Sequence, residues 1–263
     1  MTGPITSSAT QQRVTAAIAD ASARTGVGFD FLMDQAQLES GMRPDARAQT
    51  SSATGLYQFT SQTWLATVKQ HGPAHGLDWA SNAITQNRSG GYGVNDPAMR
   101  SQILDMRTHP ETAAVMAAEL ASDNGEYLQS RIGSPQQVDL YLAHFLGAKG
   151  AGDFLAAMQT DPNQAAAPLF PSAASANKSI FYRPDGMPRS LTEIRDGFAA
   201  KMASAGNVPG ALSRSAAFST QQRFATTSAR RAPMAIMDME QMPKGLDLDF
   251  ARKAYQRLSG MTA

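Results

Sequence analysis

Apolar side chains recur along most of the chain at the three- to four-residue spacing of amphipathic helices, between polar and glycine-rich segments. We predict helices over residues 10–26, 30–41, 61–72, 97–106, 110–125, 135–147, 153–158 and 191–202. Their predicted N-terminal caps are Ser8 or Thr10, Asp30, Thr60 or Ser61, Asp96, Ser134 and Ser190. The glycine-rich stretch 87–95 is predicted to be a loop. No strand-like alternation competes with the helices, so the predicted fold is predominantly α.

The chain divides into three predicted regions. Residues 1–9 are expected to be a disordered N-terminus, and residues 10–203 hold the eight helices predicted above and form one domain. From residue 204 onward the composition shifts to Ala, Ser, Thr, Arg and Met, with eight basic and four acidic residues, which predicts a flexible tail over 204–263. Residues 246–258 have the spacing of an amphipathic helix, which is either a frayed end or a docking element for a partner.

The composition excludes several classes of protein. A chain of 263 residues with 42% hydrophobic residues can bury one sizeable core, and a net charge of +1 gives no sign of a nucleic-acid partner. The absence of cysteine excludes disulfides and thiolate metal sites. No apolar run reaches the length of a transmembrane helix, and the N-terminus lacks the basic and apolar regions of a secretory signal. We expect a monomer without cofactor or metal.

Glu39 is the charged residue that stands out in the predicted helices. It shares one stripe with Leu32 and Ala36, at positions i, i+4 and i+7. Burial disfavours a charged carboxylate, and the last helical turn is the unfavourable end of the helix dipole for an anion. Both effects are expected to raise the pKa of Glu39 towards the range that a general acid needs. The alternative is a solvated glutamate at a frayed helix end.

The residues after Glu39 favour the first interpretation. Glu39-Ser40, the loop segment Pro44-Asp45-Ala46, the run Gly55-Leu56-Tyr57-Gln58 and then Thr63-Trp64 follow in order. This pattern resembles the signature of soluble lytic transglycosylases, a branch of the lysozyme-like superfamily, over about residues 39–64. The resemblance implies a lysozyme-like catalytic domain of the goose type, with a short β-ribbon within residues 42–59. It also implies peptidoglycan glycan strands as the substrate and Glu39 as the catalytic residue.

The resemblance also suggests residues that bind the substrate. It implies that Gln58 holds the N-acetyl group of a sugar and that Tyr57, where the family more often has Met, forms a wall of the cleft. Thr50 or Gln49 would replace a family serine that positions the substrate near C6. Family members usually carry A-Y-N-x-G where this chain has Ala143-His144-Phe145-Leu146-Gly147, so His144 stands at the tyrosine position. Either His144 or Tyr141, one turn earlier, could contact the carboxylate of Glu39.

The acidic residues distinguish between reaction types. Glycoside hydrolases generally use two carboxyl groups. No Asp or Glu lies between Ala46 and Val68, however, and Asp45 is expected to be a solvated turn residue. We therefore expect Glu39 to act alone as acid and then base, forming 1,6-anhydro-N-acetylmuramic acid. Alternatives are a hydrolytic muramidase, with Asp96 or Asp105 orienting water, and a non-catalytic wall-binding module.

The implied substrate places the protein in the bacterial periplasm or cell envelope, although no export signal is visible. Some family members serve flagellar or secretion-system assembly. The tail 204–263 could dock on such an apparatus and direct the wall-cutting activity to one place.

Overall fold

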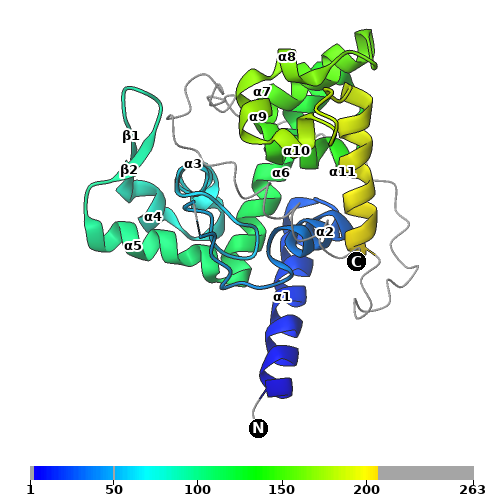
Figure 1. Cartoon of the computed structure of the whole chain (residues 1–263). Coiled ribbons are helices and arrows are strands. Elements are labelled where there is room, and N and C mark those ends of the chain that lie inside the picture. Colours follow the sequence, from blue (N-terminus) through cyan, green and yellow to red (C-terminus); the bar gives the residue numbers. More distant parts are fainter. Residues whose placement is uncertain (1–2, 50, 207–263) are drawn as a thin grey trace.

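The computed structural model describes residues 3–49 and 51–206 and confirms the predominantly α fold (Figure 1). The helices are α1 (Gly3–Thr25), α2 (Phe29–Ser40), α3 (Ser61–His71), α4 (Asp78–Ala83), α5 (Pro97–Asp105), α6 (Pro110–Ile132), α7 (Gln137–Thr160), α8 (Ala166–Leu169), α9 (Pro171–Ala176), α10 (Lys178–Phe181) and α11 (Leu191–Gly206). Two 3-10 turns, η1 (Gly72–His75) and η2 (Met106–Thr108), and the antiparallel strands β1 (Ile84–Gln86) and β2 (Tyr92–Val94) complete the described elements. Residues 207–263, which include almost all of the predicted tail, lie outside the described residues.

Helix α6 lies at the centre of the fold. It packs against α1, α3 and α7, with α3 to α5 and the β-hairpin on one side of it and α7 to α11 on the other (Figure 1). Its buried residues are mostly small, including Ala113, Ala114, Ala117 and Ala118, so neighbouring helices can approach closely. Helix α2 packs against α1 and α11. None of the helices in the described part of the chain is long and apolar enough to cross a membrane.

Local sequence signals explain several helix ends. The Thr60 side chain accepts a hydrogen bond from the backbone N–H of Thr63, and Asp96 accepts two at the start of α5, as predicted. Ser190 and Glu193 form the reciprocal bonds of a capping box at α11. Gly41 adopts the left-handed conformation that ends α2.

Other predicted helix starts were wrong. Helix α1 begins at Gly3 and so includes most of the segment 1–9 that was expected to be disordered. Asp30 lies inside the first turn of α2, after Gly28, and the capping box of α7 is formed by Gln136 and Asp139 rather than at Ser134. Each of these starts has a competing capping residue within a few positions, which sequence alone does not rank.

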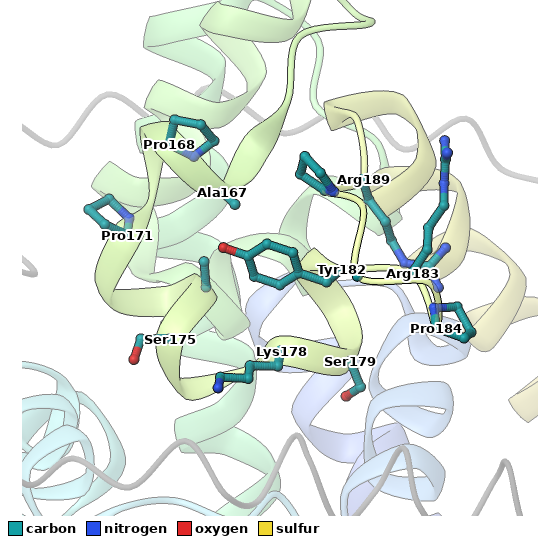
Figure 2. A pocket seen from close by; sticks show the side chains of 13 residues that line it. Ala167, Pro168, Pro171, Ser175, Lys178, Ser179, Tyr182, Arg183, Pro184 and Arg189 are labelled. Carbon is teal, nitrogen blue, oxygen red and sulfur yellow. The ribbon is translucent and has the colours of Figure 1, made fainter.

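The extents of other elements also differ from the prediction. Helix α6 passes Gly125, which is buried, and α7 continues beyond a kink at Gly147, where φ is 76°. The β-hairpin lies at residues 84–94, whereas the described residues of the loop 42–59 form isolated bridges such as Arg47 with Thr54. Helices α8 to α10 are too short for periodicity to predict. Together with the segment up to residue 189 they enclose a groove (Figure 2).

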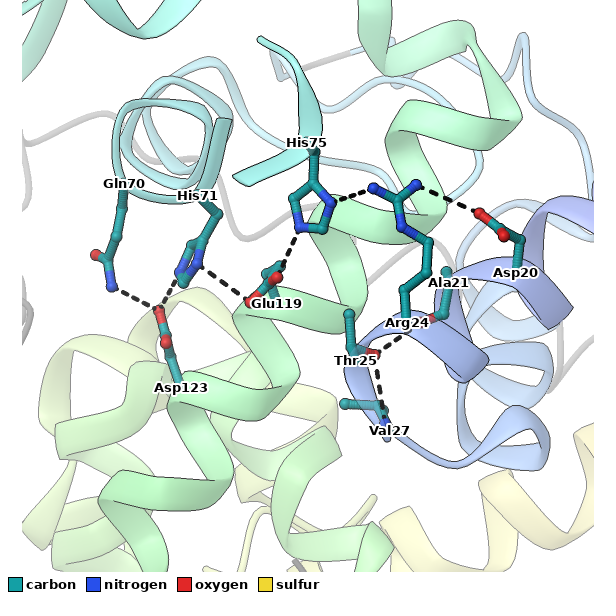
Figure 3. A network of polar contacts seen from close by, with 10 residues as sticks. All are labelled: Asp20, Ala21, Arg24, Thr25, Val27, Gln70, His71, His75, Glu119 and Asp123. Atoms are coloured by element: carbon teal, nitrogen blue, oxygen red, sulfur yellow. Dashed lines mark hydrogen bonds and ion pairs between the residues drawn. The ribbon is translucent and has the colours of Figure 1, made fainter. Parts of the chain in front are cut away.

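A cluster of the buried His71 with the part-buried His75, Glu119 and Asp123, here called the histidine cluster, joins α3 and η1 to α6 (Figure 3). His71 lies 3.2 Å from Glu119 and 2.7 Å from Asp123 through its two ring nitrogens. His75 contacts the other oxygen of Glu119 at 2.7 Å and accepts a bond from Arg24 of α1. Together with Arg24, the cluster therefore adds polar contacts between α1, α3, η1 and α6.

Candidate functional site

Glu39 lies in the last turn of α2, next to the left-handed cap. Gly41 and Met42 donate backbone hydrogen bonds to Gln37 and Ala36, which closes the helix directly after Glu39. The stripe predicted from the sequence is confirmed, because Leu32 and Ala36 are fully buried and the Glu39 side chain is only 2% exposed. The structure thus places a carboxyl group at a buried helix end.

One oxygen of this carboxyl group is held by a chain of polar contacts. Nε2 of His144, on α7, lies 3.1 Å from Oε1 of Glu39. The other ring nitrogen, Nδ1, lies 3.2 Å from the amide nitrogen of Gln35, which is buried one turn before Glu39 on α2. A donating amide at Nδ1 leaves the imidazole proton on Nε2, where it points at Glu39. Rotation of the amide would instead let Oε1 of Gln35 accept from a doubly protonated ring.

The other oxygen of Glu39 forms no hydrogen bond with any residue that the structure describes. Oε2 is buried and has no partner among them, and the same holds for Oε1 of Gln35. Buried polar atoms without partners are rare in folded proteins, and they often mark places where a ligand or a reacting group binds. Glu39 therefore has one oxygen that is positioned and one that is available for proton transfer.

Aromatic and cationic side chains surround this pair. The ring of Tyr141 stacks on His144 at 6.1 Å and meets Phe198 of α11 edge-on at 5.6 Å. Burial, then the charge of Glu39 and a hydrogen bond with its carboxyl group, raise the pKa of the Tyr141 phenol well above its usual value. Burial lowers the pKa of Lys201, an effect that Glu39 opposes. Burial alone would lower the pKa of His144, but Glu39 outweighs it and the pKa is raised above 6.5.

The structure thus brings Glu39, His144 and Tyr141 together as the sequence suggested. It also adds three residues that the sequence analysis did not identify, namely Gln35, Phe198 and Lys201. Gln35 could have been found, because it lies four residues before Glu39 on the same helix face. Phe198 and Lys201 reach the site through the packing of α11 on α2, for which the sequence carries no signal.

Gln58 lies in the loop that precedes α3, and its side chain forms hydrogen bonds within that loop. Its amide nitrogen donates to the carbonyl oxygens of Ala46 at 3.1 Å and Gly55 at 2.9 Å, and its backbone is left-handed with φ of 48°. Both amide hydrogens are therefore in use. The implied contact with a sugar N-acetyl group stays a prediction, and only the amide oxygen of Gln58 is left to make it.

The same loop is fastened to the turn η2. Arg107 is buried and donates to the carbonyl oxygens of Ser52 and Phe59 at 2.7 and 3.1 Å. Burial, with the nearby charge of Arg47, lowers the pKa of Arg107 to about 10. Gly55 is left-handed, and a Cβ there would lie 1.9 Å from the Arg107 carbonyl oxygen, so only glycine fits.

Tyr57 differs from its predicted role as a cleft wall. Its side chain belongs to the core, with 1% exposure, and its hydroxyl donates to the Leu32 carbonyl oxygen at 3.2 Å. A ring buried in this way presents no face to a sugar. Thr50 lies outside the described residues. Asp45 lies in a turn, and Asp96 serves as the cap of α5.

No group of three or more His, Asp or Glu side chains in the described ranges is arranged to hold a metal ion. A scan against models of known protein families finds no match for this chain. The resemblance to soluble lytic transglycosylases therefore rests on the residues from Glu39 to Trp64, and the functional argument rests on the geometry around Glu39.

Proposed function

We propose that this protein is a peptidoglycan lytic transglycosylase with a lysozyme-like catalytic domain, in which Glu39 is the only catalytic carboxylate. The observation that carries the proposal is the environment of Glu39. It is a buried carboxyl group with one oxygen oriented by His144 and the other without a partner. The sequence pattern from Glu39 to Trp64 supports the same reaction class.

The first step is acid catalysis. Glu39 donates a proton from Oε2 to the oxygen that links N-acetylmuramic acid to N-acetylglucosamine, and the bond from C1 to that oxygen breaks. The N-acetyl oxygen of the muramic acid stabilises the positive charge that develops at C1. His144 keeps its hydrogen bond to Oε1 while the carboxyl group becomes charged, which stabilises the product of this step.

The second step reverses the role of Glu39. Its carboxylate takes the proton of the C6 hydroxyl, and that oxygen bonds to C1 to close the 1,6-anhydro ring. Glu39 is then protonated again and ready for another cycle. No water enters the product, so a second carboxylate that orients water is not required.

The hydrolytic alternative gains no support from its candidate residues. Asp96 is exposed and already accepts two backbone hydrogen bonds as the cap of α5. Asp105 is exposed on the same helix and pairs with Ser101 at 3.4 Å. Neither residue contacts Glu39, His144 or Tyr141 in the described contacts.

Digestion of purified sacculi, followed by mass spectrometry of the released muropeptides, tests the proposal. A lytic transglycosylase releases 1,6-anhydro ends, and we expect these from the wild-type protein. Reducing ends alone would identify a muramidase, and no release would identify a wall-binding module. We place this activity in the cell envelope, where the substrate lies. The docking of residues 204–263 on a flagellar or secretion apparatus remains a hypothesis.

A further inference from the structure

A groove of about 890 Å³ lies on the lobe formed by α7 to α11, which also supplies His144 and Tyr141 (Figure 2). Helices α8 and α9 form one wall, with Pro168 and Pro171 at its edge. The segment from Tyr182 to Arg189 forms the other wall, and Lys178 lies along the lower rim. None of these residues belongs to the site around Glu39.

The charge of the groove is one-sided. Among the described residues that line it are Lys178, Arg183 and Arg189 and no acidic residue. Arg183 is neutralised by Glu193, which it contacts at 2.6 Å. Neither Lys178 nor Arg189 forms an ion pair within the described residues. Two cations therefore face the groove without a counter-charge, which favours a ligand that carries carboxylates.

The wall that carries Arg189 is fixed in place by its own backbone. Arg183 N–H donates to the Met187 carbonyl, and Arg189 N–H donates to the Phe181 carbonyl, both at 2.8 Å. Gly186 takes the left-handed conformation at the turn, with φ of 84°. A wall built in this way loses little entropy when a ligand binds.

The opposite wall is apolar and has small side chains. Ala167, Ala174 and the two prolines leave no bulky side chain on this side. The ring of Tyr182 extends across the groove towards this wall, and its hydroxyl makes no hydrogen bond in the described part of the chain (Figure 2). An extended peptide with methyl side chains on one side and carboxylates on the other would match both walls.

We infer that this groove binds an acidic peptide with small side chains, and we assign it to the stem peptides of peptidoglycan. The assignment to stem peptides rests on the proposed function, because those peptides belong to the proposed substrate and combine alanine methyl groups with free carboxylates. The groove would hold a stem peptide while Glu39 acts on a glycan strand.

Calorimetric titration of the full chain with the soluble peptide N-acetyl-L-Ala-γ-D-Glu-meso-diaminopimelyl-D-Ala tests the inference. This peptide has no glycosidic bond, so binding is measured independently of cleavage. We expect saturable binding that weakens as salt is added, because the contacts are exposed charges. The double variant Lys178→Glu/Arg189→Glu should weaken binding by about tenfold or more. A matched double variant, Arg88→Glu/Arg100→Glu, makes the same charge change on exposed residues elsewhere and should leave the affinity within about twofold.

Three results would overturn the inference: no saturable binding at millimolar peptide, equal weakening in both double variants, or equal affinity for inorganic polyphosphate. The proposed function fails separately, if sacculi are not cleaved to anhydro ends. Peptide binding without cleavage would support the peptide-binding role of the groove and refute the proposed transglycosylase activity. Cleavage without peptide binding would do the reverse.

Discussion

Three histidines in the described part of the chain contact carboxylates, and two of them, His71 and His144, differ in their surroundings. In the histidine cluster, His71 meets a carboxylate at each ring nitrogen, and both oxygens of Glu119 are bound (Figure 3). His144 meets Glu39 at one nitrogen and the amide of Gln35 at the other, and Oε2 of Glu39 and Oε1 of Gln35 are left without partners. A fully bonded cluster stabilises the fold, whereas a cluster with unused acceptors is prepared for another molecule.

The protonation states of His71 and His144 differ for the same reason. Both nitrogens of His71 must donate, so the ring is an imidazolium; burial opposes this, but Asp123 and Glu119 outweigh it and raise the His71 pKa to about 9. The pKa of Glu119 is correspondingly lowered to about 2, with the bond from His71 as its main cause. At His144 a neutral ring can satisfy both of its contacts. The proton can therefore move at the Glu39 site, while it is fixed in the histidine cluster.

The largest effect on stability is expected for His71→Gln. The folded-state pKa of about 9 lies above the unfolded value of 6.5, so the charged ring stabilises the fold below pH 6.5. This contribution, about 3 kcal/mol, disappears as the pH rises through 9. Denaturant unfolding at several pH values should show the wild type approaching the variant in stability at high pH. The control His109→Gln changes an exposed histidine. A constant difference between wild type and His71→Gln across this range would contradict the prediction.

Gln58→Ala should lower the free energy of unfolding by about 2 kcal/mol, because the carbonyl oxygens of Ala46 and Gly55 each lose one of their two donors. The sequence resemblance alone predicts the opposite pattern, namely weaker glycan turnover with normal stability. Melting temperature and sacculus digestion at low temperature separate the two. Unchanged stability with lost turnover would restore the sugar-binding role.

His144→Gln should shift the pH dependence of activity and lower the rate by about tenfold. The Glu39–His144 pair holds its proton above pH 6.5, because the His144 pKa is raised, so the wild type should stay active to higher pH than a lone carboxyl group. Without the imidazole, the fall in rate on the alkaline side of the pH–rate profile should move to lower pH. The measurement is the pH–rate profile for release of anhydro ends, and identical limbs in the two proteins would refute a shared proton.

Gln35→Glu should move the alkaline limb the other way, by about one pH unit. The new carboxylate would give His144 an acidic partner at each nitrogen, as His71 has, and would hold the proton on the ring. The rate at neutral pH should then fall several-fold without loss of stability. A limb that moves to lower pH would show that Gln35 does not control the protonation of His144.

The sequence predicted those features that depend on neighbouring residues. The buried stripe of α2, the glycine that ends it and the caps at Thr60 and Asp96 are all encoded within a few positions. The buried position of Tyr57 and the hydrogen bonds of Gln58 could not be predicted, because distant partners decide them. The Tyr57 hydroxyl bonds to Leu32, 25 residues away, and the Gln58 amide bonds back to Ala46 across its loop. The spacing of apolar residues and the composition carry no information about such contacts.

The histidine cluster was missed for the same reason. His71 lies on α3 and Asp123 on α6, and the two residues are 52 positions apart in the sequence. Lys201 likewise reaches Glu39 only because α11 packs on α2. A helix-by-helix interpretation places each of these residues on a face, but it does not say which faces meet.

A parallel measurement on Glu39→Gln and Glu119→Gln tests the central claim most directly, because both replace a carboxylate that contacts a histidine by its amide. We expect Glu39→Gln to lose at least about 100-fold in sacculus digestion while its stability is unchanged or higher. Glu119→Gln should lose stability by about 2 kcal/mol or more, yet digest sacculi at a near-normal rate when folded. Digestion by Glu39→Gln within about tenfold of wild type would contradict the account, and so would a folded Glu119→Gln protein without activity.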